Sequence, residues 1–143
     1  MSSSHDYVRD KRNDNIKIYI NGRFYPRNKA NISVFDSGFL LGDGVWSGIR
    51  LHNHKLLFIK EHLKRLKDDA MQIGLKIHLS KKELEKAIYK TTNINKMKSD
   101  VHIRLVVSRG IKSTPYQDPA FTISKPTIVI IPEYKIPQEK TYK

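Results

Sequence analysis

The sequence predicts an α+β domain of two layers, in which a sheet of antiparallel or mixed strands packs against helices. Three observations lead to this fold class. Residues 16–20 and residues 101–109 each alternate between two kinds of side chain with a period of two, which is typical of strands. Residues 59–74 carry apolar side chains at helical spacing. Strands therefore precede and follow a helical region in the sequence, and the two kinds of element would share one core.

The composition fits one globular domain. The 143 residues are enough for a hydrophobic core, with 38% hydrophobic and 29% charged residues. The chain has no cysteine, which excludes a disulfide scaffold, a zinc finger and a cysteine nucleophile. The longest apolar runs have four residues. A membrane helix needs about 20, so we expect no membrane partner.

A β-hairpin is predicted at residues 16–26. Isoleucines alternate with Lys17 and Tyr19 in the first strand. Asn21-Gly22 follows, a pair that tolerates the positive φ angles of a tight hairpin turn. Pro26 would end the second strand.

The next segment, residues 32–50, carries four glycines. It contains no Gly-Lys-Ser/Thr sequence and leads into a strand, so it is not a phosphate loop. Spacing alone favours glycines that serve tight turns and close packing. Residues 45–51 predict a strand, 52–55 a turn and 56–58 a returning strand.

Two helices are expected next. Apolar residues in 59–74 are spaced 4, 3, 4 and 3 positions apart and form one stripe, and Gly74 is a suitable stop. Ser80 and Glu83 match a capping box, which predicts the start of a second helix. Its inward residues would be Leu84, Ala87, Ile88 and Thr91.

A long strand is predicted at 101–109, a loop at 114–119 and a buried strand at 126–132. His102 and Arg104 lie on one face of the long strand, and its other face is apolar. Such a strand is either half exposed or lines a pocket. The two polar side chains could therefore bind an anionic group of a substrate, and a half-exposed face is an equally good interpretation.

The terminal segments are polar. Residues 1–15 lack the apolar core of a secretory signal and contain three aspartates, which a mitochondrial presequence would avoid. We expect a disordered lead-in at 1–15, the domain at 16–132 and a linker at 133–143. The absence of targeting signals and cysteines indicates a cytoplasmic protein.

The net charge is +13, which raises the affinity for any polyanion. Nineteen of the 27 basic residues are lysines spread along the chain, and acidic residues lie among the densest groups. No nucleic-acid-binding motif is present. A solvated lysine-rich surface is the simpler interpretation, so we expect no specific nucleic-acid partner.

Isolated polar residues give weaker signals. Arg65 lies beside the apolar stripe of its helix, so its planar guanidinium could reach a phosphate or carboxylate in a cleft. An exposed arginine that covers apolar surface is the commoner case. His52 and His54 have no third ligand in view, so no metal site is predicted.

Several of these segments occur together in a specific order. The Asn-Gly hairpin is followed by Asp-Ser-Gly-Phe-Leu-Leu-Gly-Asp-Gly-Val-Trp-Ser-Gly-Ile-Arg at 36–50, by Glu-His-Leu-Lys-Arg-Leu at 61–66 and by Ser-Arg-Gly at 108–110. In this respect the chain resembles the class IV aminotransferases, the pyridoxal-phosphate enzymes of fold type IV, from about Ile16 to Pro132. That family includes branched-chain and D-amino-acid aminotransferases, (R)-selective amine transaminases and aminodeoxychorismate lyase.

The resemblance implies roles for four residues. Arg65 matches the arginine that binds the phosphate of pyridoxal 5′-phosphate. Trp46 stands where the family has a Phe or Tyr that lines the substrate pocket, and His102 and Arg104 match substrate-binding positions of a Tyr-x-Arg strand. Ser47 departs from the family, which commonly has Glu there, so the substrate stays open.

The family's catalytic lysine, which forms a Schiff base with the cofactor, matches no lysine of this chain. The resemblance places it beyond the chain end, so we expect the small N-terminal domain of a longer enzyme, inactive as a fragment. The full enzyme would be a homodimer that moves an amino group between a branched-chain or D-amino acid and a 2-oxo acid. The lyase branch of the family and a non-catalytic basic binding module are the alternatives.

Overall fold

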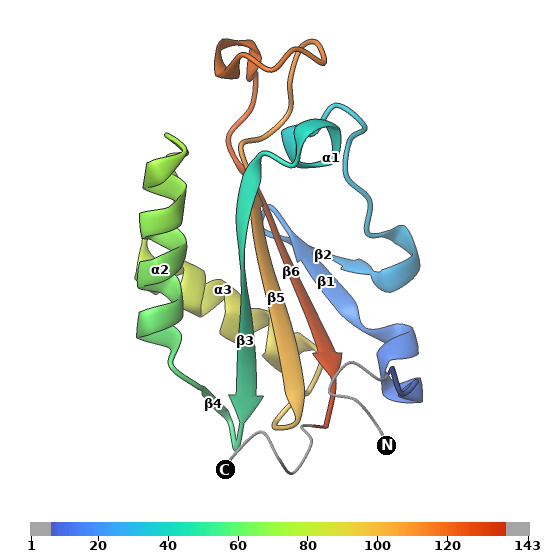
Figure 1. The fold of residues 1–143 in the computed structure, drawn as a ribbon. Coiled ribbons are helices and arrows are strands. Elements are labelled where there is room, and N and C mark those ends of the chain that lie inside the picture. The colour runs from blue at the N-terminus through green and yellow to red at the C-terminus, as the bar shows by residue number, and fades with distance from the viewer. Residues whose placement is uncertain (1–6, 137–143) are drawn as a thin grey trace.

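The computed structural model describes residues 7–136 of the chain (Figure 1). The strands are β1 (Lys17–Ile20), β2 (Arg23–Pro26), β3 (Gly44–His52), β4 (Lys55–Leu56), β5 (Val101–Ser108) and β6 (Thr127–Tyr134). The α-helices are α1 (Ser37–Leu41), α2 (Ile59–Gln72) and α3 (Lys81–Ile94). Short 3-10 helices occupy η1 (Lys11–Asn15), η2 (Arg27–Lys29) and η3 (Pro119–Phe121).

The six strands form one sheet in the order β2-β1-β6-β5-β3-β4, with antiparallel pairing at each neighbour. Helices α2 and α3 cover one face of this sheet (Figure 1). The two-layer α+β fold expected from the sequence is therefore confirmed, and the sheet is antiparallel rather than mixed.

The core lies between the helices and the sheet. Val101, Ile103, Leu105 and Val107 of β5 are each fully buried, as the alternation predicted. The helical stripes supply the opposing layer, with Leu63, Leu66 and Ala70 from α2 and Leu84, Ala87, Ile88 and Thr91 from α3. Burying these side chains removes apolar surface from water, which is the main stabilising contribution to the fold.

Two predicted turn and cap signals are confirmed. Asn21 and Gly22 both have positive φ, at 50° and 91°, as a tight hairpin turn requires. The Ser80 side chain accepts a hydrogen bond from the Glu83 amide, and the Glu83 side chain accepts one from the Ser80 amide. This capping box begins α3 at the expected residue.

The segment before β3 differs from the prediction. Residues 37–41 form the short helix α1, because the Asp36 side chain accepts a hydrogen bond from the Gly38 amide and caps its first turn. The strand expected at 56–58 is also shorter. β4 ends at Leu56, and Phe58 adopts a φ of 54° that turns the chain into α2.

The ends of the domain also differ from the expected boundaries. Residues 11–15, part of the expected lead-in, form η1. The Asn13 side chain makes two hydrogen bonds to the main chain of Tyr134. Its Nδ2 donates to the Tyr134 carbonyl at 3.0 Å, and its Oδ1 accepts from the Tyr134 backbone amide at 2.7 Å. Strand β6 extends to Tyr134, into the segment expected to be a linker. Residues 1–6 and 137–143, which belong to the two expected terminal segments, lie outside the described residues.

No helix within residues 7–136 is long and apolar enough to cross a membrane.

Candidate functional site

Strand β3 has a free edge beside α2. β4 pairs only with Leu51 and His52, so within the described chain no strand pairs with this side of residues 44–49. The Arg50 carbonyl accepts a bond from the Leu57 amide at 2.9 Å, on the side away from β5. Backbone groups alternate sides along a strand, so the amides and carbonyls of Trp46 and Gly48 also point toward this edge. The free edge therefore offers hydrogen-bonding groups to a ligand.

Two sequence-predicted residues meet on the sheet face opposite the helices, which we call the outer face. Gly48 of β3 pairs with Arg104 of β5, and Trp46 pairs with Val106. The Arg104 guanidinium lies 4.5 Å from the centre of the Trp46 ring. This cation–π contact holds the arginine over a ring that is itself 60% exposed. The pair presents a cation and an aromatic surface side by side.

His102 joins this group on the outer face. A Cβ atom at Gly48 would lie 2.9 Å from His102 Nε2, so the imidazole occupies space that only glycine leaves open. Burial lowers the pKa of His102 from its ordinary value, and the nearby cations, led by Lys135, lower it further. Both effects favour the neutral imidazole, which can donate or accept a hydrogen bond.

Arg65 lies on α2, on the other side of the sheet from Trp46. His62, one turn earlier, shares a hydrogen bond of 3.1 Å between its Nδ1 and Ser47 Oγ. This bond places the first half of α2 beside the middle of β3. Burial lowers the pKa of His62, and the neighbouring Arg65 lowers it further. The Arg65 side chain is exposed and has no hydrogen bond or ion pair with residues 7–136.

The structure thus brings Trp46, His102 and Arg104 together, and it separates Arg65 from them by the edge strand β3. One ligand could touch both groups only by lying across the free edge. An anion there would have the Arg65 guanidinium on one side and the Arg104–Trp46 pair on the other.

An ion pair that the sequence did not indicate stabilises this arrangement. Arg109 Nε donates to Asp43 Oδ2 at 2.6 Å, and Arg109 Nη2 donates to Asp43 Oδ1 at 3.2 Å. The same guanidinium donates to the carbonyls of Ile73 and Gly74 at 2.6 Å and 3.1 Å, just beyond the end of α2. We call this group the Arg109 clamp. It joins the start of β3, the end of β5 and the end of α2.

A loop with its own contacts follows the clamp. The Lys112 ammonium is buried and donates to the Asp118 carbonyl at 3.0 Å, and Tyr116 packs edge-on against Phe121. Figure 1 shows this loop at the same end of the sheet as α1. Several apolar side chains near this end are exposed, namely Val34, Phe39, Tyr116 and Ile123. Within residues 7–136 no cluster of three or more histidine and acidic side chains could hold a metal ion.

Comparison with known proteins gives a consistent result. The family described as "Amino-transferase class IV" matches residues 44–143. A protein of Methanocaldococcus jannaschii, provisionally named a branched-chain-amino-acid aminotransferase, is 41% identical over 116 residues, which are 81% of this chain and 39% of that protein. A Staphylococcus aureus D-alanine aminotransferase is 29% identical over 123 residues, 86% of this chain and 43% of the enzyme.

Solved structures share the fold. A branched-chain aminotransferase from Thermoproteus uzoniensis, crystallised with norvaline, has a TM-score of 0.69 and 27% identity, over 83% of this chain and 40% of that one. The T.th. branched-chain amino acid aminotransferase with pyridoxamine 5′-phosphate has a TM-score of 0.73 and 25% identity, over 89% of this chain and 42% of that one. The chain thus spans about two fifths of the length of these relatives.

Proposed function

The chain belongs to the class IV aminotransferase family, and we propose that it forms part of a pyridoxal-phosphate enzyme that transfers an amino group between an amino acid and a 2-oxo acid. The observation that carries this proposal is the exposed Arg65 guanidinium, which has no hydrogen bond or ion pair with residues 7–136 and lies on the helix beside the free edge of β3. An available guanidinium and backbone amides without strand partners together suit the phosphate of a cofactor.

The geometry of α2 supports this role for Arg65. His62 is hydrogen-bonded to Ser47 of β3. The end of the helix lies near Asp43, just before the same strand, because the Arg109 clamp binds both Asp43 and the carbonyl of Ile73. Helix α2 therefore runs antiparallel to β3. Three residues of helix rise about 4.5 Å, so Arg65 lies further toward the start of β3 than His62 does. A phosphate bound there would lie close to the free edge.

The described residues fit the cofactor and a substrate in separate places. Arg65 would hold the phosphate of pyridoxal 5′-phosphate, which when bound supplies an electron sink for reactions at the substrate Cα. On the outer face, Arg104 would bind a substrate carboxylate, and the Trp46 ring would contact the substrate side chain. Neutral His102 would donate or accept one hydrogen bond there.

We propose that no lysine within residues 7–136 forms the Schiff base. Lys112, a buried lysine, directs its ammonium to the Asp118 carbonyl inside the loop after the clamp. We therefore propose that transamination needs the part of the relatives that this chain does not match. We also propose, from the family resemblance, that the complete enzyme acts as a homodimer.

The phosphate-binding role can be tested on the chain itself. We would titrate isotopically labelled chain with pyridoxamine 5′-phosphate, which cannot form imines with surface lysines, and with pyridoxamine as the control that lacks phosphate. Amide signals of Trp46 and Gly48 should shift with the phosphorylated compound alone. Arg65→Ala should weaken this binding about tenfold, the usual worth of one charge-assisted contact.

A matched substitution controls for net charge. Arg23 is an exposed arginine on β2, away from the free edge, so Arg23→Ala should leave the affinity unchanged. Equal affinity for the two pyridoxamine compounds, or equal losses in the two variants, would rule out Arg65 as the phosphate ligand.

A further inference from the structure

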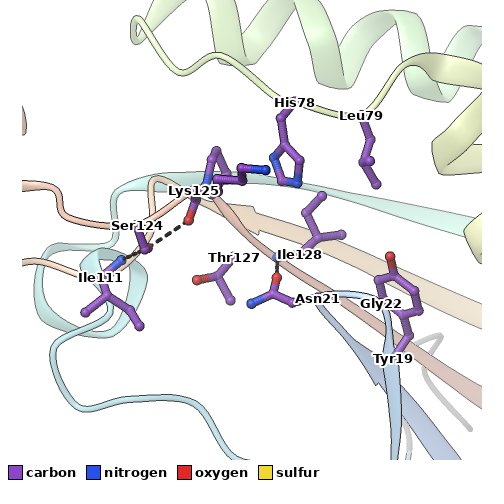
Figure 2. A pocket seen from close by; sticks show the side chains of 11 residues that line it. Tyr19, Asn21, Gly22, His78, Leu79, Ile111, Ser124, Lys125, Thr127 and Ile128 are labelled. Carbon is purple, nitrogen blue, oxygen red and sulfur yellow. Dashed lines mark hydrogen bonds between the residues drawn. The ribbon is translucent and has the colours of Figure 1, made fainter.

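A pocket of about 530 Å³ lies on the helix side of the sheet, between the β1–β2 turn, the α2–α3 connection and the start of β6 (Figure 2). Tyr19 of β1 lies on the wall of the pocket. A row of cross-strand pairs connects it to β3: Tyr19 pairs with Ile130, Ile130 with Leu105, and Leu105 with Ser47. Residues paired in this way share one face of a sheet. Because Ser47 contacts α2, the pocket lies on the opposite face from the Arg104–Trp46 pair.

Hydrogen bonds hold the walls of this pocket in place. Ser124 Oγ accepts from the Ile111 amide and donates to the Lys125 carbonyl, each at 2.8 Å (Figure 2). A Cβ atom at Gly110 would lie 2.5 Å from the same Lys125 carbonyl, so the two backbones are packed without space between them. The main chain of Lys125 is therefore fixed, and its side chain projects from a rigid base.

The opposite wall is fixed by the hairpin turn. The Asn21 amide donates to the Ile128 carbonyl at 3.0 Å, and Asn21 Oδ1 accepts from the Ile128 amide at 2.8 Å. The side-chain amide nitrogen, Asn21 Nδ2, has no hydrogen-bond partner within residues 7–136. Thr127, in contrast, already donates its hydroxyl proton to Asp36 at 2.6 Å and is not free for a ligand.

The lining is basic at one end and apolar at the other. Figure 2 shows the Lys125 ammonium beside the His78 ring. No carboxylate lines the pocket, and Lys125 has no ion pair with residues 7–136. His78 and Lys125 are both exposed, and the half-buried Leu79 supplies apolar surface next to them, whereas Ile128 is buried in the core below. Small-molecule sites commonly combine apolar walls with a few polar groups that point inward.

We infer that this pocket binds a small organic anion, whose carboxylate or phosphate oxygens contact Lys125 and His78 and whose apolar part lies against Leu79. This inference is independent of the proposed aminotransferase function. The shared chemistry is an anionic oxygen group on a short apolar body, and the experiment below distinguishes a carboxylate from a phosphate.

The protonation of His78 gives a direct readout. Burial lowers the pKa of His78, and Lys125 and Lys67 lower it further while Glu83 opposes them. The pKa of Glu83 is itself lowered by its hydrogen bonds to Ser80, which favours the charged carboxylate. A bound anion favours the charged imidazole and should raise the pKa of His78.

The test uses four probes on the chain: 3-methylbutanoate, 3-methylbutyl phosphate, inorganic phosphate and the neutral 3-methylbutanamide. Binding would be followed through the His78 ring signals and the Asn21 side-chain amide signals by NMR. We expect one or both organic anions to bind and to raise the pKa of His78. The tighter of the two identifies the preferred oxygen group, and inorganic phosphate should bind more weakly because it lacks the apolar part.

Two variants separate a built site from net charge. Lys125→Ala should weaken binding of the preferred anion about tenfold, because one charge-assisted contact is lost. Lys86→Ala removes an equal charge from an exposed position of α3 and should leave binding unchanged. His78→Gln gives a second route if the first variant folds poorly, and it should also weaken binding. The inference is wrong if neutral 3-methylbutanamide binds as tightly as the organic anions, or if both lysine variants lose affinity equally. It is also wrong if no probe changes the NMR signals of His78 and Asn21.

Discussion

Removal of the Arg109 side chain should destabilise the domain strongly. Arg109 and Asp43 are only 12% and 19% exposed, and the guanidinium makes two hydrogen bonds to the carboxylate and two to the carbonyls of Ile73 and Gly74. Loss of one partner from a largely buried ion pair costs about 3–5 kcal/mol, because the other charge stays buried without compensation. Since both groups keep some contact with water, we expect about 3 kcal/mol for Arg109→Ala.

Urea unfolding followed by circular dichroism measures this loss as a lower midpoint with an unchanged slope. Arg109→Lys keeps the charge but not the planar fork, so it should recover only part of the stability. A double-mutant cycle with Asp43→Ala isolates the direct pair, and we expect a coupling of about 1–3 kcal/mol.

Arg27→Ala is the matched control. Arg27 also pairs with a carboxylate, Glu133 at 3.3 Å, but the two side chains are 45% and 38% exposed. Such surface pairs contribute about 1 kcal/mol or less. If Arg109→Ala cost no more than Arg27→Ala, or if the cycle gave no coupling, the Arg109 clamp would not stabilise the fold as argued.

Two further predictions concern histidines. Gly48→Ala should cost about 1 kcal/mol in urea unfolding because its Cβ would lie 2.9 Å from His102 Nε2 and the half-buried imidazole would have to turn away, and His102→Ala should remove most of this cost in the double variant. The unfolding free energy should also fall as pH drops below 6.5, because His62, His78 and His102 have lowered pKa values when folded and the unfolded chain therefore binds more protons. Urea unfolding from pH 8 to pH 5 measures this slope, which should become shallower in His102→Gln, and a flat profile would contradict it.

Short-range signals predicted the elements well. The capping box at Ser80 and Glu83 joins residues three positions apart, and the Asn21-Gly22 turn depends on the φ preferences of two neighbours. The stripe of α2 follows from helical spacing alone. In each case the residues that determine the structure are close together in the chain.

Contacts between residues far apart in the chain could not be predicted from the sequence. Asp43 and Arg109 are 66 positions apart, and nothing in their local patterns indicates that they meet. The glycine segment gave no helical periodicity over the five residues of α1, which exists because Asp36 caps it and Thr127 binds that same carboxylate from β6. Asn13 likewise orders η1 through contacts with Tyr134 at the end of the sheet.

The sequence by itself determined the family resemblance, the two long helices and most of the strands, and it proposed the residues of the candidate site, because these depend on residue identity and local spacing. It placed His102 and Arg104 on one side of a strand but could not tell whether helices cover that side. The tertiary structure decided this point, since the helices pack on the Ser47 side and leave Trp46 and Arg104 on the outer face. It also left residues 44–49 of β3 without a pairing strand on one side, because strand pairing depends on contacts between residues far apart in the chain.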